Sequence, residues 1–301
     1  MQPTTAPQAL KDCLILLVGF GSEYSLGPLE RFLASTGLDF IACDLQNGAL
    51  PAPPKRPLVL VTSQHPSTSS AIFNASWGRS LPFSNYVAPD QLLARLSPEI
   101  AVFIPHDLEA PIRADEIAYM GIFDLYCSPV PVNPALERIC KSIHTGWIKH
   151  NAIDVVPEAI RKLASHNGVF FVNQIAAVLA AGGVSHLRTN YPSIFGHGIP
   201  IKLPQWPGTD AMTAQLRAEG ELVIESDAAS TPIIAASPRI FVNAAGSVVA
   251  EAKYVGTPVV MLDQRGELGE PSPPSERRQV PHFKFDLLLA TLSSLRTHRY
   301  S

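Results

Sequence analysis

Short apolar runs alternate with longer mixed segments along most of this chain, and this alternation restricts its fold more than any other feature. Five runs in the first half have the length of strands and are rich in β-branched or aromatic residues: 14–18, 40–43, 58–61, 100–104 and 123–127. Between the first two, residues 26–35 carry apolar side chains at helical spacing. Buried parallel strands are continuously apolar, so the pattern predicts βαβ units.

A proline-rich segment, residues 128–134, interrupts this alternation, which then resumes with five further apolar runs at 169–172, 199–203, 222–225, 240–242 and 258–262. The fold class we predict is therefore α/β, with two facing Rossmann-like domains and a ligand cleft at the carboxyl ends of their strands. The expected domains are 1–150 and 151–282. Residues 283–301 are expected to form an amphipathic helix that packs back near the domain junction.

Composition excludes some classes of function. The 301 residues have a formal net charge of -3, which argues against a general nucleic-acid-binding protein. No apolar run approaches the ~18 residues needed to span a bilayer, and the first twelve residues lack the pattern of a signal peptide. We therefore expect a cytoplasmic protein. Apolar helical segments at 176–181 and 287–295 leave homodimerisation or peripheral membrane association open.

A Gly-Ser turn between two apolar runs predicts an anion site. Asn243 follows the first run, and Gly246, Ser247 and Val248 lie where a helix is expected to begin. Backbone N–H groups at a helix start are unpaired, and the helix dipole favours a phosphate there. Glu251 falls one turn deeper, where its carboxylate could accept hydrogen bonds from ribose hydroxyls. The alternative is an ordinary helix start with a solvated glutamate.

The segment from Asn243 to Val260 resembles the donor site of GT-B-fold glycosyltransferases and of the related CDP-glycerol glycerophosphotransferases, which build capsule and cell-wall polymers. The resemblance implies an enzyme that transfers a sugar or polyol phosphate from a nucleotide-sugar or CDP-polyol donor to a hydroxyl of a glycan or lipid-linked acceptor. It implies an acceptor domain followed by a donor domain, with the nucleotide-linked donor as substrate and no separate cofactor. The sequence also lacks the Asp-x-Asp pair, the His-x-x-x-His helix and the cysteine cluster of common metal sites, which favours metal-independent chemistry.

Three further residues are candidates for donor binding. His197 and Lys202 lie in a segment that resembles the His-Gly-x-Pro-x-Lys sequence of the glycerophosphotransferases, and either could contact the donor phosphates. A glycine-bracketed turn with a surface lysine is the structural alternative. Asp227 ends another apolar run and is expected near the donor base.

The first domain supplies the candidates for acceptor binding and catalysis. His106 and Asp107 follow an apolar run, where either could deprotonate an acceptor hydroxyl. The alternative is a strand-end turn in which Asp107 caps a helix. Gly21, Ser22 and His65 lie in polar turns after other apolar runs and are candidate acceptor contacts, although such residues are also common in ordinary loops.

Two other functions fit the same patterns. A nucleotide-sugar epimerase has a similar fold and donor turn, and it consumes its substrate without an acceptor. A nucleotide- or glycan-binding module would bind such ligands without turnover.

Overall fold

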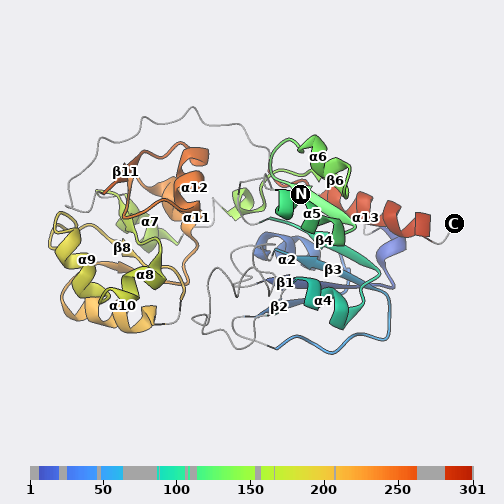
Figure 1. Ribbon diagram of the computed structural model, residues 1–301, viewed down its shortest axis with the longest axis horizontal. Helices are drawn as coiled ribbons and strands as arrows, with labels where there is room; N and C mark the ends of the chain where they lie inside the picture. Colours follow the sequence, from blue (N-terminus) through green and yellow to red (C-terminus); the bar gives the residue numbers. More distant parts are fainter. Residues whose placement is uncertain are drawn as a thin grey trace. The chain divides into compact units, whose positions relative to one another are not determined.

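The computed structural model describes residues 7–19, 26–45, 49–63, 87, 89–105, 108, 114–152, 157–165, 167–206, 208–262 and 282–299. The chain divides into two compact units (Figure 1). The first comprises Met1–Asn151 and Val280–Ser301, and the second comprises Ala152–Gln279. Each unit contains one sheet in which every strand pair is parallel. The predicted α/β class with two parallel sheets is therefore confirmed.

The sheet of the first unit has six strands in the order β2-β1-β3-β4-β5-β6. They are β1 (Leu14–Gly19), β2 (Phe40–Asp44), β3 (Leu58–Thr62), β4 (Ile100–Phe103), β5 (Leu125–Ser128) and β6 (Lys141–His144). The first five correspond to the predicted apolar runs. The edge strand β6, which the apolar pattern did not predict, reads Lys-Ser-Ile-His and pairs with β5 alone.

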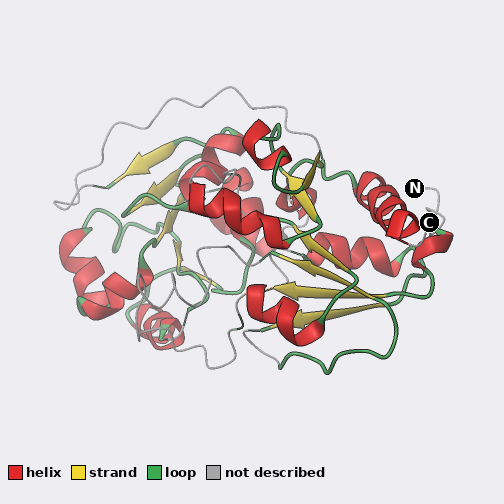
Figure 2. Cartoon of the chain, turned by 45° about the vertical axis from the view of Figure 1, so that its right-hand side comes forward, coloured by secondary structure: helices red, strands yellow, loops and turns green. Residues whose placement is uncertain are grey.

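Helices cover both faces of this sheet (Figure 2). The helices of the first unit are η1 (Gln8–Leu10), α2 (Gly27–Ala34), α4 (Pro89–Leu96), α5 (Ala114–Tyr119), η4 (Met120–Ile122), α6 (Pro134–Glu137), η5 (Ile148–Ala152) and α13 (Phe285–Arg299). Because side chains alternate along a strand, Ile15 and Leu17 of β1 pack in one apolar cluster with α2 and α13, whereas Leu14 and Leu16 pack in another with α4. Burial on both faces explains the unbroken apolar sequence of β1.

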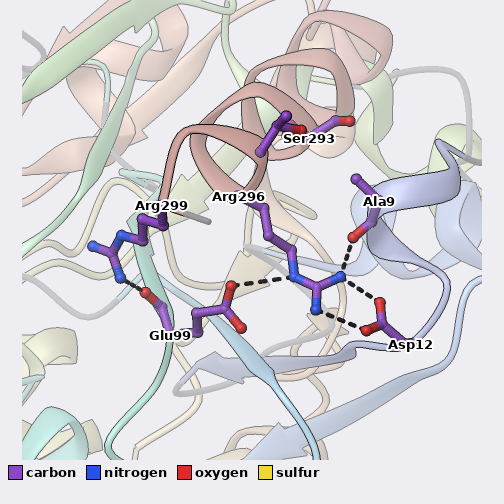
Figure 3. A network of polar contacts seen from close by, with 7 residues as sticks. Ala9, Asp12, Glu99, Ser293, Arg296 and Arg299 are labelled. Atoms are coloured by element: carbon purple, nitrogen blue, oxygen red, sulfur yellow. Dashed lines mark hydrogen bonds and ion pairs between the residues drawn. The ribbon is translucent and has the colours of Figure 1, made fainter. Parts of the chain in front are cut away.

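The long helix α13 is bound to distant parts of the first unit through Arg296 (Figure 3). The guanidinium donates to the carboxylate of Asp12 and the carbonyl of Ala9, and its Nε donates to Oε1 of Glu99 at 3.2 Å. Leu288 and Leu292 of the same helix are buried in the core. The C-terminal helix therefore belongs to the first unit although the second unit precedes it in sequence.

The sheet of the second unit has five parallel strands in the order β11-β10-β7-β8-β9. They are β7 (Val169–Phe171), β8 (Ile201–Lys202), β9 (Val223–Ile224), β10 (Ile240–Val242) and β11 (Val259–Met261). The chain winds from β7 through β8 to β9, and then returns to β10 on the other side of β7. The carboxyl ends of β7 and β10 therefore form a topological switch point, where open α/β sheets bind ligands.

In the described part of the second unit, six helices connect or flank these strands. They are α7 (Glu158–Ala164), α8 (Ile175–Ala180), α9 (Val184–Asn190), α10 (Thr209–Ala218), α11 (Ser230–Ala236) and α12 (Ser247–Val255). The apolar pattern between β7 and β8 is compatible with one continuous helix, but the structure has two, α8 and α9. Gly182 and Gly183 separate them with φ angles of 111° and 61°, in the left-handed region that favours glycine.

Candidate nucleotide site

Helix α12 begins at the switch point without a side-chain cap. Gly246 is its N-cap residue, in an extended conformation with φ 177° and ψ -178°, and no side chain in the described part of the chain caps the helix. Gly246 and Ser247 are exposed, and the first turn contains no acidic residue. An exposed helix start of this kind presents backbone N–H groups and about half a unit of positive charge to solvent. This geometry suits a phosphate.

Two asparagines join the strands that border the switch point. Asn173 follows β7 and Asn243 follows β10, and they form reciprocal hydrogen bonds. The backbone N–H of Asn173 donates to Oδ1 of Asn243 at 2.6 Å, and Nδ2 of Asn243 donates to the carbonyl of Asn173 at 3.1 Å. We call these residues the asparagine pair. The sequence pattern indicated Asn243 but not Asn173, although an amide directly after a buried apolar run was the available signal.

Glu251 is buried rather than solvated, with 3% of its surface exposed. Its Oε2 accepts a hydrogen bond of 2.7 Å from the hydroxyl of Thr231, in the first turn of α11. The predicted alternative of a solvated glutamate is therefore wrong. Thr231 was not a candidate from sequence, because no local pattern connects residues twenty positions apart on two different helices.

Lys202 is also buried, with 3% of its surface exposed, so the alternative of a surface lysine is wrong. Its ammonium donates to the carbonyl of Leu203 at 2.9 Å and to that of Ser226 at 2.8 Å, joining the carboxyl ends of β8 and β9. Burial lowers the pKa of Lys202 from its ordinary 10.5 to about 8, while the nearby carboxylates of Asp227 and Glu225 oppose this shift. Asp227 itself is exposed.

The structure does not bring His197 together with the other candidates. This residue is exposed and precedes β8 by four positions, so it lies before the amino end of a strand whose carboxyl end borders the candidate site. The flanking Gly196 and Gly198 have φ angles of 72° and 68°, as expected for a glycine-bracketed turn.

Several candidates lie outside the described residues. These are the two candidate bases and the three candidate acceptor contacts, namely His106, Asp107, Gly21, Ser22 and His65. Within the described part of the chain, no group of three or more histidines, cysteines or acidic residues could hold a metal ion. No helix in that part is both long and apolar enough to cross a membrane.

Comparisons with known proteins found likenesses among solved structures. The chain matches no protein-family model and no curated protein. It is similar to MnaA of S. aureus, solved with UDP, at 14% identity, with 94% of this chain and 88% of that chain covered and a TM-score of 0.43. It is similar to the wall teichoic acid polymerase TagF at 12% identity, with 86% of this chain and 72% of that chain covered and a TM-score of 0.44. It is also similar to a UDP-GlcNAc 2-epimerase from Neisseria meningitidis, bound to UDP-GlcNAc, at 12% identity, with 96% of this chain and 92% of that chain covered and a TM-score of 0.37.

These neighbours are GT-B-type enzymes, the group that the sequence resembles. Because their identities are low and their TM-scores lie below 0.5, they carry no argument for a shared activity. The function proposed for this chain therefore rests on its own residues.

Proposed function

We propose that this chain is a glycosyltransferase that moves a sugar or polyol phosphate from a nucleotide-activated donor to an acceptor hydroxyl, in the synthesis of a surface polysaccharide or other glycan. The observation that carries the proposal is the exposed start of α12 at the topological switch point of the second unit, where no side chain of the described residues caps the helix. A nucleotide diphosphate supplies the negative charge that suits this position.

In this proposal the second unit binds the donor. Backbone N–H groups near Gly246, Ser247 and Val248 contact the diphosphate, and Asp227 approaches the base. The bond between the transferred group and the nucleotide breaks during the reaction, so negative charge grows on the departing phosphate. The fixed dipole of α12 stabilises this charge most in the transition state, which is how such a site accelerates the reaction.

The first unit binds the acceptor. His106 or Asp107 removes the proton from the acceptor hydroxyl, whose oxygen then forms the new bond to the transferred sugar carbon or polyol phosphorus. Gly21, Ser22 and His65 are the proposed acceptor contacts. We assign Glu251 and Lys202 to the support of the donor site, because each bonds to its own protein through a buried side chain.

Thermal unfolding with UDP-, GDP-, CDP- and CMP-linked donors tests the proposal. A ligand that binds only the folded protein stabilises it by about 2.7 kcal/mol at a hundred times its Kd. We expect at least one of the three nucleotide diphosphate donors, those linked to UDP, GDP or CDP, to raise Tm, and failure of all three would contradict the proposal.

Product analysis then separates the three functions. A transferase consumes the donor rapidly only when an acceptor is present. Consumption of a nucleotide sugar without an acceptor, with formation of its epimer, would establish an epimerase instead. Binding without turnover across a broad set of acceptors would establish a binding module.

A further inference from the structure

The side-chain amide of Asn243 forms hydrogen bonds with the backbone of Asn173, as the backbone of a neighbouring strand would. Beyond the last residues of β7 and β10, both backbone groups of Asn173 are bound by this one side chain, which accepts from the N–H and donates to the carbonyl. The contact continues the hydrogen bonding between the two strands at the point where they separate. It therefore limits how far the carboxyl ends of β7 and β10 can separate.

The side chain of Asn173 in turn holds the turn that precedes α12. Its Nδ2 donates to the carbonyl of Ala244 at 2.7 Å. A Cβ added to Gly246 would lie 3.2 Å from Cγ and from Nδ2 of Asn173, closer than nine in ten real Cβ contacts. The absence of a side chain at position 246 thus lets the turn lie against this amide, and the position of the turn depends on the asparagine pair.

The residue after Asn173 is strained. Gln174 has φ 51° and ψ 44°, in the left-handed region, where a residue other than glycine is uncommon. Such a conformation persists where the surrounding structure imposes it, and it is frequent at functional sites. The bonds of Asn243 to both backbone groups of Asn173 provide that constraint on one side, and the buried Ile175 provides it on the other.

We propose that Asn173 and Asn243 are positioning residues that fix the turn from Ala244 to Gly246, so that the first N–H groups of α12 point at the diphosphate of the bound nucleotide. The inference rests on the proposed function. It assigns a role to Asn173, which lies 71 residues before the first residue of the turn in sequence. The two residues act through the backbone of the turn.

Binding of UDP, GDP and CDP, each compared with its nucleoside, tests this role. In Asn173→Ala and Asn243→Ala, the affinity for the diphosphate that the wild type binds should fall at least tenfold, whereas that for the matching nucleoside should change less than threefold. If the two asparagines had only a structural role, the affinities for the diphosphate and for the nucleoside would fall equally or not at all. Asn190→Ala is the matched control, because the half-buried Asn190 also donates from its side chain to a backbone carbonyl of the second unit, that of His186 at 2.8 Å.

A double variant separates crowding from positioning. Gly246→Ala alone places a methyl group against the amide of Asn173. Combining it with Asn173→Ala provides room for this methyl group but does not restore the bond to Ala244. We expect diphosphate affinity in the double variant to stay at least tenfold below that of the wild type. Recovery of wild-type affinity would show that the bond has no role and would overturn the proposal.

Hydrogen exchange gives a decision that does not depend on the function. If the wild type binds none of UDP, GDP and CDP, the proposed function fails. The positioning role is then decided by amide exchange of Val249, whose N–H donates to the carbonyl of Gly246 at 3.0 Å. This exchange should be at least tenfold faster in Asn173→Ala than in the wild type or in Asn190→Ala. Unchanged exchange, or unchanged affinity where the wild type binds, would overturn the inference.

Discussion

The hydroxyl of Thr231 donates a hydrogen bond of 2.7 Å to the carboxylate of Glu251, and both side chains are buried. This bond joins the first turn of α11 to the middle of α12, the helix whose start we propose as the phosphate site. Burying a carboxylate without a hydrogen bond would lower the stability of the fold, so this bond supports the packing of α12.

Thr231→Val should lower the free energy of unfolding by about 1–3 kcal/mol, because it removes a hydrogen bond to a buried carboxylate with little change in shape. Thr213→Val is the matched control. Thr213 is a buried threonine of the same unit whose Oγ1 has no partner in the described part of the chain. Removing that hydroxyl should leave stability unchanged or raise it. Urea denaturation measures both, and equal losses in the two variants would contradict the role of the Thr231 bond.

Lys202 should make stability depend on alkaline pH. Its folded pKa of about 8 lies below the ordinary 10.5, so between these values the unfolded chain holds a proton that the folded chain has released. Stability therefore rises with pH across this window, by about 3 kcal/mol in total. Below pH 8 both states are protonated, and the full cost of the buried charge is present.

The variant Lys202→Met removes this contribution. The free energy of unfolding of the wild type, minus that of the variant, should increase as pH rises from 7 to 10.5. Other groups that titrate in the same range cancel in the difference. Parallel pH profiles for the two proteins would contradict the depressed pKa of Lys202.

Arg296→Met should destabilise the first unit by about 2 kcal/mol or more, because it leaves the largely buried carboxylate of Glu99 without its guanidinium partner. The hydrogen bond from Arg296 also lowers the pKa of Asp12, so part of the stabilisation is present above the ordinary pKa of 3.8 and is lost as pH falls. The difference in free energy of unfolding between wild type and variant should therefore become smaller at acidic pH.

The control for this prediction is Arg161→Met. Arg161 lies 3.9 Å from Glu158 in an exposed pair on one helix. Exposed pairs contribute little, so this variant should change stability by less than about 0.5 kcal/mol. Equal unfolding curves for the two methionine variants would show that the network around Arg296 is no more than a surface contact.

The sequence predicted those parts of the fold that depend on local apolar pattern. Strands buried on both faces, such as β1 and β3, appear as continuous apolar runs. The edge strand β6 has a mixed sequence and gave no such signal. The apolar residues on either side of Gly182 and Gly183 fit one continuous helix. The break between α8 and α9 follows from the backbone angles of these two glycines, which the apolar pattern does not predict.

In the candidate site too, features set by consecutive residues could be predicted from the sequence, whereas features set by tertiary packing could not. The turn before α12 was visible because its residues are consecutive, and the helix begins at Ser247 as predicted. The partnership of Asn173 with Asn243 depends on strand order, which places residues seventy positions apart side by side. Burial of Lys202 likewise depends on packing, and a lysine after a short apolar run is more often exposed.

Ser247→Asp tests the phosphate site through opposite effects on stability and binding. A carboxylate in the first turn of a helix interacts favourably with the dipole, by about 0.3–1 kcal/mol, so the unliganded variant should be as stable as the wild type or more so. The same charge repels a diphosphate. Ser247→Asn has a neutral side chain of similar size and is the control.

The most direct measurement of the central claim is calorimetric titration of UDP, GDP and CDP into the wild type, Ser247→Asp and Ser247→Asn. We predict that at least one nucleotide binds the wild type, that Ser247→Asn binds it within about threefold, and that Ser247→Asp loses at least thirtyfold, about 2 kcal/mol, in affinity. Equal affinity of Ser247→Asp and wild type, or binding of none of the three nucleotides to the wild type, would contradict the proposed phosphate site.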